Sequence, residues 1–390
     1  MRHLRSSLLL VSAAALAACS DQGSPTAAGD QLSAAAAPIR AAAAGKGVEG
    51  SYIVVLKEGA NPRSVAAITG VDPRFVYTAA VNGFAGELNA GQLNALQHNP
   101  NVEYIEQDQV GGIEVTQSGA TWGLDRIDQT ANALNGTYIY TNTASNVTAY
   151  ILDTGIAATH AQFGGRASNV WNYSGGIVAD CHGHGTHVAG TIGSTTYGVA
   201  KGVRLRGVRV VDCQGGGQTS YVIAGMDWVR LNHVKPAVAN MSLGYPYSST
   251  INTAVTNMIN AGVFTAVASG NENRNACGVV SPASATAALT VNASTSANAR
   301  ASFSNYGSCT DIYAPGQNIT STWLNGGTNT ISGTSMASPH AAGVAALYKG
   351  TFGDAASSTV HAWIVNNATL NVITGNPTGT PNRLLNKRTL

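Results

Sequence analysis

Short, almost continuous apolar runs alternate with helical patterns through the C-terminal two thirds of the chain. The runs that predict strands are Val147–Leu152, Leu205–Val211, Ala237–Leu243, Val263–Ala268 and Ala288–Val291. Runs without polar alternation are typical of strands buried on both faces of a parallel sheet. Between them, Gly217–His233 and Asn252–Ala261 place apolar residues at helical spacing. This alternation predicts a doubly wound α/β domain, whose ligand sites lie at the carboxyl ends of the strands.

A different pattern precedes this domain. Strand-like and helix-like segments follow one another in the order βαββαβ, at Ser51–Lys57, Pro62–Thr69, Arg74–Ala79, Val81–Leu88, Gly91–His98 and Val102–Gln107. This order is typical of a small α+β ferredoxin-like domain. Since a free-standing domain of about 60 residues is marginally stable, we expect the segment 51–110 to dock on the larger domain.

The first 50 residues predict a leader and a spacer. Two arginines precede the apolar stretch Leu8–Leu16, so residues 1–19 have the pattern of an export signal. The sequence Leu-Ala-Ala-Cys at residues 16–19 fits ordinary signal cleavage and lipidation of Cys19 equally well. Both routes lead out of the cytoplasm, and the lipid would be the chain's one attachment to a membrane. Residues 20–50 are rich in Ala, Gly and Ser, which predicts a flexible spacer.

The composition indicates the compartment of the protein and excludes one class of partner. The net charge of +2, without a cluster of basic residues, argues against nucleic acid as a partner. With 44% apolar residues, a chain of 390 residues can build two unequal cores. If Cys19 belongs to the leader, four cysteines remain for an oxidising compartment, and four cysteines permit three pairings. They are Cys181, Cys213, Cys277 and Cys309.

Three motifs lie at the carboxyl ends of predicted strands or at the starts of helices. Asp153 opens Asp-Thr-Gly, His184 opens His-Gly-Thr-His-Val-Ala-Gly-Thr, and Ser335 lies in Gly-Thr-Ser-Met-Ala-Ser-Pro-His. Each residue alone is compatible with a cap or a turn. Together they supply a hydroxyl nucleophile, an imidazole base that titrates near neutral pH, and a carboxylate that orients the imidazole. The order Asp, His, Ser is one of three in which such triads occur.

These three blocks resemble the signatures of the subtilisin superfamily. The resemblance runs from about Trp122 to the C-terminus and is greatest to the proteinase K and aqualysin branch, through Trp122–Gln129, Asn240–Gly244 and Arg300–Gly307. It implies a monomeric serine endopeptidase that cleaves protein or peptide substrates and needs no cofactor for catalysis. The catalytic set that it implies is Asp153, His184 and Ser335, with Asn271 as a donor to the oxyanion.

The resemblance also implies that the substrate adds as an extended strand between two clamping edges. The implied binding residues are Gly215, Gly216, Gly217, Ser242, Leu243 and Gly244, with a primary pocket formed by Ala268, Ser269 and Gly270. Two departures leave the cleavage preference open. Tyr245 stands where the family usually has a second glycine, and Gly278–Val280 lacks the aromatic residue of relatives.

Disulfides and structural calcium follow from the same resemblance. Similarity to aqualysin pairs Cys181 with Cys213 and Cys277 with Cys309. Calcium prefers several oxygen ligands held by a rigid loop, and two sets of residues match sites in relatives. The first set is Asp125, Asp128, Gln129, Asn135 and Thr137. The second set is Asp311 with the carbonyl groups of Thr286 and Ala288.

Residues 51–110 resemble the inhibitor prodomain of this family, which packs on the catalytic sheet and leaves its C-terminal tail in the cleft. The resemblance therefore implies a secreted zymogen whose prodomain is an intramolecular inhibitor. We expect self-cleavage near Glu114–Val115, which would leave residues 115–390 as the catalytic domain.

Two other classes remain open on the residues alone. His182, His184 and His187 have a spacing compatible with a zinc hydrolase, although no acidic pattern nearby completes such a site. A catalytically inactive surface lipoprotein of the same fold is the second alternative, and the intact catalytic set argues against it. His182 has no assigned role, whereas His187 and His340 are expected to be structural.

Overall fold

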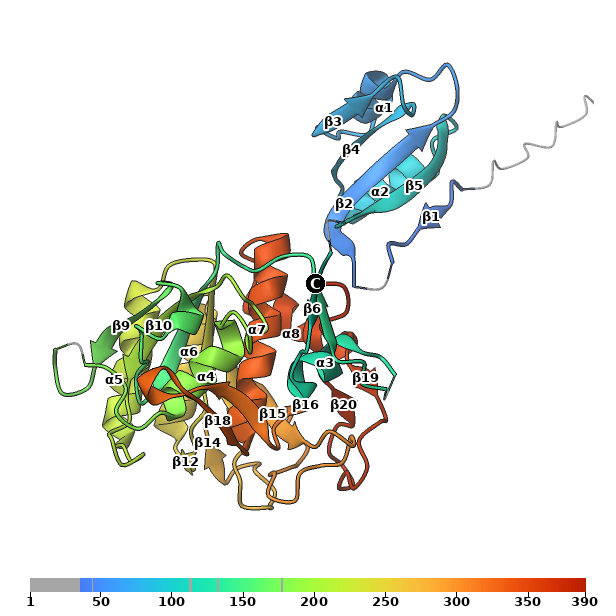
Figure 1. The fold of residues 1–390 in the computed structure, drawn as a ribbon. Helices are drawn as coiled ribbons and strands as arrows, with labels where there is room; N and C mark the ends of the chain where they lie inside the picture. Colours follow the sequence, from blue (N-terminus) through green and yellow to red (C-terminus); the bar gives the residue numbers. More distant parts are fainter. Residues whose placement is uncertain (1–35, 44, 112–113, 132, 177) are drawn as a thin grey trace, which may run out of the picture.

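The computed structural model describes residues 36–43, 45–111, 114–131, 133–176 and 178–390. The predicted export signal and most of the predicted spacer lie outside this part of the chain. Figure 1 shows a small N-terminal domain and a larger domain that contains the main sheet. In the part of the chain that is described, no helix combines the length and apolar character needed to cross a membrane.

The small domain has the predicted βαββαβ order. Its elements are β2 (Gly47–Leu56), α1 (Pro62–Ile68), β3 (Phe75–Tyr77), β4 (Gly83–Glu87), α2 (Ala90–Gln97) and β5 (Val102–Gln109). The sheet has the order β1-β5-β2-β4-β3, in which the short strand β1 (Ile39–Arg40) adds parallel to β5. Its core is small and packs both helices on one face of the sheet through side chains such as Val54, Phe84, Leu96 and Ile105.

This small sheet begins earlier than the sequence indicated. The spacer was predicted to end at residue 50, but β1 and the start of β2 lie within that range. The amide of Ile105 donates to the carbonyl of Pro38 over 3.0 Å, and Ala37 is buried. The free edge of β5 supplies the hydrogen bonds that hold β1, and composition does not reveal such a partner.

The large domain is built on a nine-stranded sheet of order β19-β20-β16-β15-β13-β11-β8-β10-β9, in which only β19 is antiparallel. The five predicted runs are β8 (Thr148–Asp153), β10 (Arg204–Arg209), β11 (Ala237–Met241), β13 (Phe264–Ala268) and β15 (Leu289–Ser294). The apolar pattern did not predict the other strands of this sheet, which are β9 (Ala167–Asn172), β16 (Ile312–Pro315), β19 (Thr369–Leu370) and β20 (Arg383–Leu384). The predicted fold class, a doubly wound α/β domain, is confirmed, because all five predicted runs are strands of this almost entirely parallel sheet.

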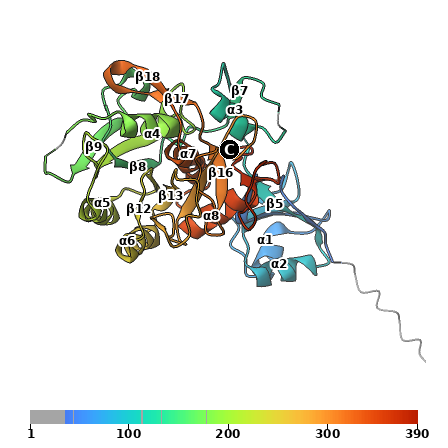
Figure 2. The same cartoon turned by 90° about the horizontal axis from the view of Figure 1, so that it is seen from below.

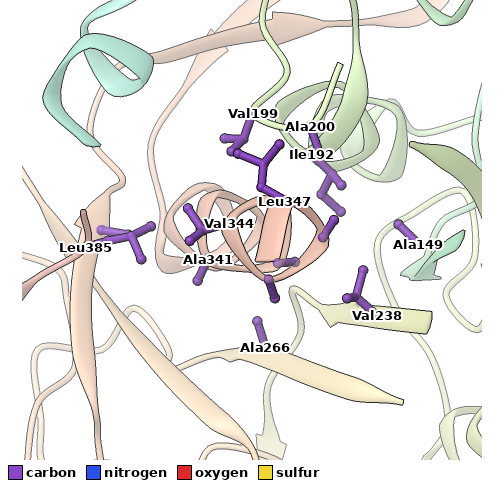
Figure 3. Packing of buried hydrophobic residues seen from close by; sticks show 14 of the residues in the cluster. Ala149, Ile192, Val199, Ala200, Val238, Ala266, Ala341, Val344, Leu347 and Leu385 are labelled. Carbon is purple, nitrogen blue, oxygen red and sulfur yellow. The ribbon is translucent and has the colours of Figure 1, made fainter. Parts of the chain in front are cut away.

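Helices cover both faces of this sheet, because alternate residues of each strand point to opposite faces. On β8, Ala149 and Ile151 belong to the cluster around α4 (His184–Gly193) and α7 (Thr334–Phe352). Tyr150 and Leu152 belong to the cluster with α5 (Thr219–Asn232) and α6 (Ser249–Asn260). Figure 3 shows α7 surrounded by small and branched apolar side chains from the sheet and from α4. Packing on both faces holds the carboxyl ends of the strands in place.

The small domain lies beside the end of α7 and beside α8 (Ser357–Asn366), as Figure 2 shows. A hollow between the two domains is lined by Glu49 and Tyr52 on one side and by Tyr348 and Trp363 on the other. After β5, the chain continues into β6 (Val115–Ser118), which pairs antiparallel with β7 (Thr137–Tyr140) along its whole length.

Candidate active site

Asp153 and His184 meet at the carboxyl end of β8. Asp153 is the last residue of the strand and only 1% exposed, and the amide of Thr154 donates to its Oδ1 over 2.8 Å. His184 opens α4, and its Nδ1 lies 2.8 Å from Oδ1 and 2.9 Å from Oδ2 of Asp153. The contact fixes the orientation of the imidazole ring and directs its Nε2 away from Asp153.

The residue before His184 has to be glycine. Gly183 has φ = +102°, and a Cβ at this position would lie 2.5 Å from the indole ring of Trp323. Only glycine combines this backbone conformation with this close approach. The turn at Gly183 places His184 at the very start of α4.

Asp180 connects the loop before α4 to the end of β8, and the sequence analysis missed it. Its buried carboxylate accepts the backbone amides of His182, Gly183 and Thr186 over 2.9 to 3.0 Å. It also accepts the hydroxyls of Thr154 and Thr186 over 2.9 and 2.6 Å. The signal in the sequence was an aspartate just before a helix, which is a typical capping residue.

We expect Asp180→Ala to lower kcat more than it raises KM. Asp180 holds the segments that carry Asp153 and His184, so its loss should loosen the contact between these two side chains. Asp180 does not itself line the hollow, so substrate binding should change less. Removing an acceptor for five donors also leaves buried N–H groups unpaired, so the melting temperature should fall. Asp180→Asn keeps one acceptor oxygen, so both kcat and the melting temperature should fall less than in Asp180→Ala. Steady-state kinetics and thermal unfolding measure the two effects, and unchanged kcat in the alanine variant would contradict the positioning role.

The pKa of His184 is raised above its ordinary value. Burial on its own lowers this pKa, but the charge of Asp153, its hydrogen bond to Nδ1 and the charge of Asp180 outweigh the effect of burial. The two carboxylates therefore make the imidazole a stronger base than a free histidine.

Ser335 lies in the first turn of α7, where it faces the end of β11. Its Oγ donates to the carbonyl of Ser242 over 3.2 Å, and Ser242 Oγ donates to the carbonyl of Ser335 over 2.7 Å. Asn240 extends this link, since it donates to Ser242 and accepts from Ser338. The structure holds Ser335 and His184 in the same hollow, but no hydrogen bond joins these two described side chains.

Asn271 lies in the turn after β13, next to the start of α7. Its Oδ1 accepts the amide of Thr334 over 2.8 Å and the hydroxyl of Thr334 over 2.9 Å. With the oxygen occupied in this way, the side-chain NH₂ group is left to donate. Asn271 and Ser335 line the same hollow.

A hollow of about 600 Å³ extends from these four side chains. The predicted binding residues that line it are Gly215, Gly216, Gly217, Ser242, Leu243, Gly244, Ala268 and Gly270. Ser269 does not line it, because its side chain is fully buried. Seven further lining residues had no predicted role in the site: Thr154, His182, Val211, Gln214, Tyr245, Glu272 and Thr334.

The described residues of the small domain do not line this hollow, which differs from the expected placement of its tail in the cleft. Every described residue that lines the hollow belongs to the large domain. The reason is the pairing of β6 with β7, because only residues 110–114 separate the end of β5 at Gln109 from the start of β6 at Val115. The six steps from Gln109 to Val115 span at most about 21 Å, so the paired strand keeps the small domain near α8.

Both disulfides have the pairing implied by the resemblance to aqualysin. Cys181 bonds to Cys213 and Cys277 to Cys309, each across 32 positions. The first joins the loop before His184 to the loop that leads into Gly215–Gly217, and Arg209 donates to both of its sulfur atoms over 3.2 Å. Each cross-link is worth about 3–4 kcal/mol when it closes a loop of this length.

The other histidines do not assemble a zinc site. His187 Nε2 lies 3.0 Å from the carbonyl of Ile319, and burial lowers the pKa of His187 to about 4. Burial likewise lowers the pKa of His340 to about 4. Both rings are therefore neutral structural groups. No group of three acidic, histidine or cysteine side chains suited to a metal ion occurs in the part of the chain that the structure describes.

The first calcium set does not fit a divalent cation. Asp125 accepts the amides of Asn135 and Gly136, and Asp128 Oδ2 accepts the amide of Ile139. The buried ammonium group of Lys387 lies 2.9 Å from Asp128 Oδ1 and already supplies the positive charge. Asn135 Oδ1 accepts both donors of Thr137, and Arg126 and Asn386 donate to the carbonyl of Gln129.

The second set fits a cation better. Asp311 Oδ2 accepts the amide of Thr290, but Oδ1 faces only His361 Nε2, at 3.4 Å, and the side chain is 25% exposed. Thr286 is exposed beside His361, whereas Ala288 is buried and can offer only its carbonyl. A partly exposed carboxylate oxygen is the kind of ligand that Ca²⁺ prefers, and the carbonyls of Thr286 and Ala288 are the further ligands that the resemblance implies.

A parallel α/β sheet with Asp, His and Ser side chains around one hollow defines a serine hydrolase of the type that uses an imidazole base. Comparison with known proteins agrees. The model of the subtilase family matches residues 144–386, and that of the peptidase inhibitor I9 matches residues 71–111. The chain belongs to the subtilase family and is a serine proteinase with an inhibitor-type prodomain.

Relatives match over most of both chains. An extracellular serine proteinase of Thermus sp. (strain Rt41A) is 48% identical and covers 97% of each chain. Proteinase R of Parengyodontium album is 44% identical over 88% of this chain and 90% of its own. The crystal structure of a cold-adapted subtilisin-like serine proteinase superposes with a TM-score of 0.68 at 46% identity, covering 70% of this chain and all of that one.

Proposed function

We propose that the protein is a secreted endopeptidase that cleaves peptide bonds through an acyl-enzyme on Ser335. The observation that carries the proposal is the position of His184, whose Nδ1 contacts the buried carboxylate of Asp153 while the ring lines the same hollow as Ser335. An imidazole between a carboxylate and an alcohol is the arrangement that activates a weak hydroxyl nucleophile.

The reaction begins when the Ser335 side chain rotates from the carbonyl of Ser242 toward His184. As Oγ attacks the scissile carbonyl, Nε2 of His184 takes the hydroxyl proton. The tetrahedral intermediate collapses, the C–N bond breaks, and the imidazolium gives the proton to the leaving amine. Water then enters and attacks the ester carbonyl as His184 takes its proton, the ester C–O bond breaks, and the imidazolium returns the proton to Ser335 Oγ. Asp153 stays ionised and stabilises the imidazolium throughout.

Two N–H donors stabilise the oxyanion that forms in each step. The backbone amide of Ser335 belongs to the first turn of α7, where amides have no partner within the helix. The NH₂ group of Asn271 lies beside it, because Oδ1 is held by Thr334. Both donors are in place before the charge develops, which is what makes such groups effective.

We expect Asn271→Leu to lower kcat by about 10²–10³-fold, as loss of one oxyanion donor does in subtilisin, with little change in KM. Leucine keeps the size of the side chain but removes the donor. Asn271→Asp is the matched variant, because it keeps the acceptor for Thr334 and also lacks the donor. Kinetics with a peptide anilide measure the effect, and wild-type kcat in both variants would rule out this role for Asn271.

The two edges of the hollow are suited to hold an extended peptide. Gly215–Gly217 and Ser242–Gly244 both line the hollow, and within the first edge the amides of Gly215 and Gly216 and the carbonyl of Gly216 are held by Asp212. A peptide that lies between them adds a strand, and main-chain hydrogen bonds then bind it with little regard to its side chains. This arrangement favours unfolded protein segments as substrates.

We also propose that the protein is made as an exported zymogen. The leader at residues 1–19, the two disulfides and relatives described as extracellular support export. A cut near Glu114–Val115 by the protein's own site would separate the inhibitor-type domain from residues 115–390. If Cys19 carries a lipid, that lipid stays with the small domain, and the enzyme diffuses away.

Structural calcium is proposed at the Asp311 set alone. In the inactive Ser335→Ala background, which prevents self-digestion, saturating calcium should raise the melting temperature by about 5 °C and chelation should reverse this, since binding at 100 times Kd adds about 2.7 kcal/mol. Adding Asp311→Ala should abolish the response, whereas adding Asp128→Asn should preserve it. Equal responses with and without Asp311 would refute this site.

The proposed function is tested by a serine-directed phosphonylating reagent. Peptide mapping should find one modified residue, Ser335, and casein hydrolysis should stop in proportion to the labelling. A zinc hydrolase would remain active after treatment, and an inactive binding protein would show no hydrolysis before it. Either result would overturn the proposal.

A further inference from the structure

Tyr245 lies at the outer end of the hollow, directly after the clamping residues Ser242–Gly244. Its side chain is half-buried and lines the hollow, and it packs with Leu243 against the apolar cluster on the α5–α6 face of the sheet. Its backbone pairs antiparallel with Ser281, through the two-stranded sheet of β12 (Tyr245–Pro246) and β14 (Val280–Ser281). The position of the ring is therefore held from two sides.

The position of Tyr245 relative to the cut follows from the strand geometry. Ser335 Oγ contacts the carbonyl of Ser242, so Ser242 marks the place of the scissile bond. An extended chain advances about 3.3 Å per residue, which places Tyr245 about 10 Å farther along the edge. A peptide strand beside this edge advances at the same rate. The residue opposite Tyr245 is therefore about the fourth, counted from the residue that carries the scissile carbonyl.

The phenol of Tyr245 reaches from one edge of the hollow to the other. A Cβ on Gly217, which belongs to the opposite edge, would lie only 2.9 Å from the hydroxyl oxygen of Tyr245. The ring thus forms the floor between the two edges at the point where the side chain of the fourth residue would enter. Burial and the charges of Asp153 and Asp212 raise the pKa of Tyr245, so the floor is a neutral phenol.

We propose that Tyr245 is a specificity-determining residue that fills the subsite for the fourth residue on the acyl side of the cut. The enzyme then accepts small side chains at this place and disfavours large apolar ones, because an aromatic ring already occupies the recess. This inference rests on the proposed function, since it takes Ser335 as the point from which the substrate is counted.

The test uses two blocked tetrapeptide p-nitroanilides that differ only in the outermost residue, alanine or phenylalanine. For the wild-type enzyme, kcat/KM should be about tenfold higher with alanine, which is the size of discrimination that a filled apolar pocket gives. Tyr245→Ala empties the recess and should reverse the preference, so that phenylalanine becomes the better substrate by about tenfold. Tyr245→Phe retains the ring and should keep the wild-type ratio.

The ratio of kcat/KM values within one variant does not depend on how much of it is folded, and the wild-type ratio tests the proposal without any variant. A wild-type preference for phenylalanine, or an unchanged ratio in Tyr245→Ala, would overturn the proposal. The proposal would also be overturned if Tyr245→Ala changed the preference only for residues on the leaving-group side of the cut, measured with internally quenched peptides. Failure of the proposed function looks different, because Ser335→Ala would then still cleave both anilides.

Discussion

Replacing Ser335 by alanine should lower kcat by about a million-fold, the loss known for the corresponding serine of subtilisin. The variant keeps the hollow, the Asp153–His184 contact and both oxyanion donors, but it has no hydroxyl to attack the substrate. Only slow, uncatalysed attack by water, assisted by the remaining groups, is then left. Casein and peptide anilides measure the loss, and the mass of the purified chain shows whether the small domain is still attached.

Ser332→Ala is the matched control, because Ser332 is exposed in the same loop and its hydroxyl contacts only Asn318. It should keep wild-type kcat. An active Ser335→Ala variant would end the proposed mechanism. A Ser335→Ala chain that is cut at the usual place by itself would end the proposal of self-processing.

Asp153→Asn should lower kcat by about ten-thousand-fold. The amide retains the size of the side chain, but it lets His184 adopt the wrong tautomer and no longer stabilises the imidazolium. Stability should change little by comparison, because the amide still fills the buried position at the end of β8. Asp227→Asn is the matched control, because it makes the same replacement at an exposed aspartate on α5, and it should have no effect on kcat.

The same variant has a defined pH signature. His184 acts as a base only when neutral, so kcat/KM is lost as pH falls through its pKa. The carboxylate of Asp153 raises that pKa, while burial alone lowers it. Removing the carboxylate charge therefore moves the acid limb of the kcat/KM profile to lower pH. A limb that stays in place or moves to higher pH would show that Asp153 does not set this pKa.

The sequence was sufficient to predict the main strands of the sheet and most of the residues around the hollow. Strands buried on both faces are continuous apolar runs, and the carboxyl ends of neighbouring parallel strands meet at one edge. Asp153 was predicted at the end of a buried strand on this ground, whereas Asn271, in the turn after β13, was implied only by the resemblance to the subtilisin superfamily. The short outer strands β16 and β20 lacked a pattern of their own and depend on their neighbours for hydrogen bonds.

What the sequence analysis missed depends on contacts between distant segments. Asp180 has an ordinary capping position in the sequence, and its importance comes from Thr154, which lies at the end of another element. The calcium ligand set around Asp128 looked complete, but Lys387 occupies it from the last turn of the chain. A pattern of oxygen ligands along the sequence does not reveal a cation that arrives from so far away.

For the proposed self-processing, the ladder between β6 and β7 sets the order of the steps. A cut at Glu114–Val115 would place Val115 at Ser335, directly after the residues that the clamping edges hold, so Val115 would have to leave its pairing with Tyr140 of β7. The ladder must open before the chain is cut near Glu114–Val115. If the ladder re-forms after the proposed cut, pairing with Tyr140, which does not line the hollow, holds the new amino group of Val115 away from the ester on Ser335 and so opposes resealing of the bond.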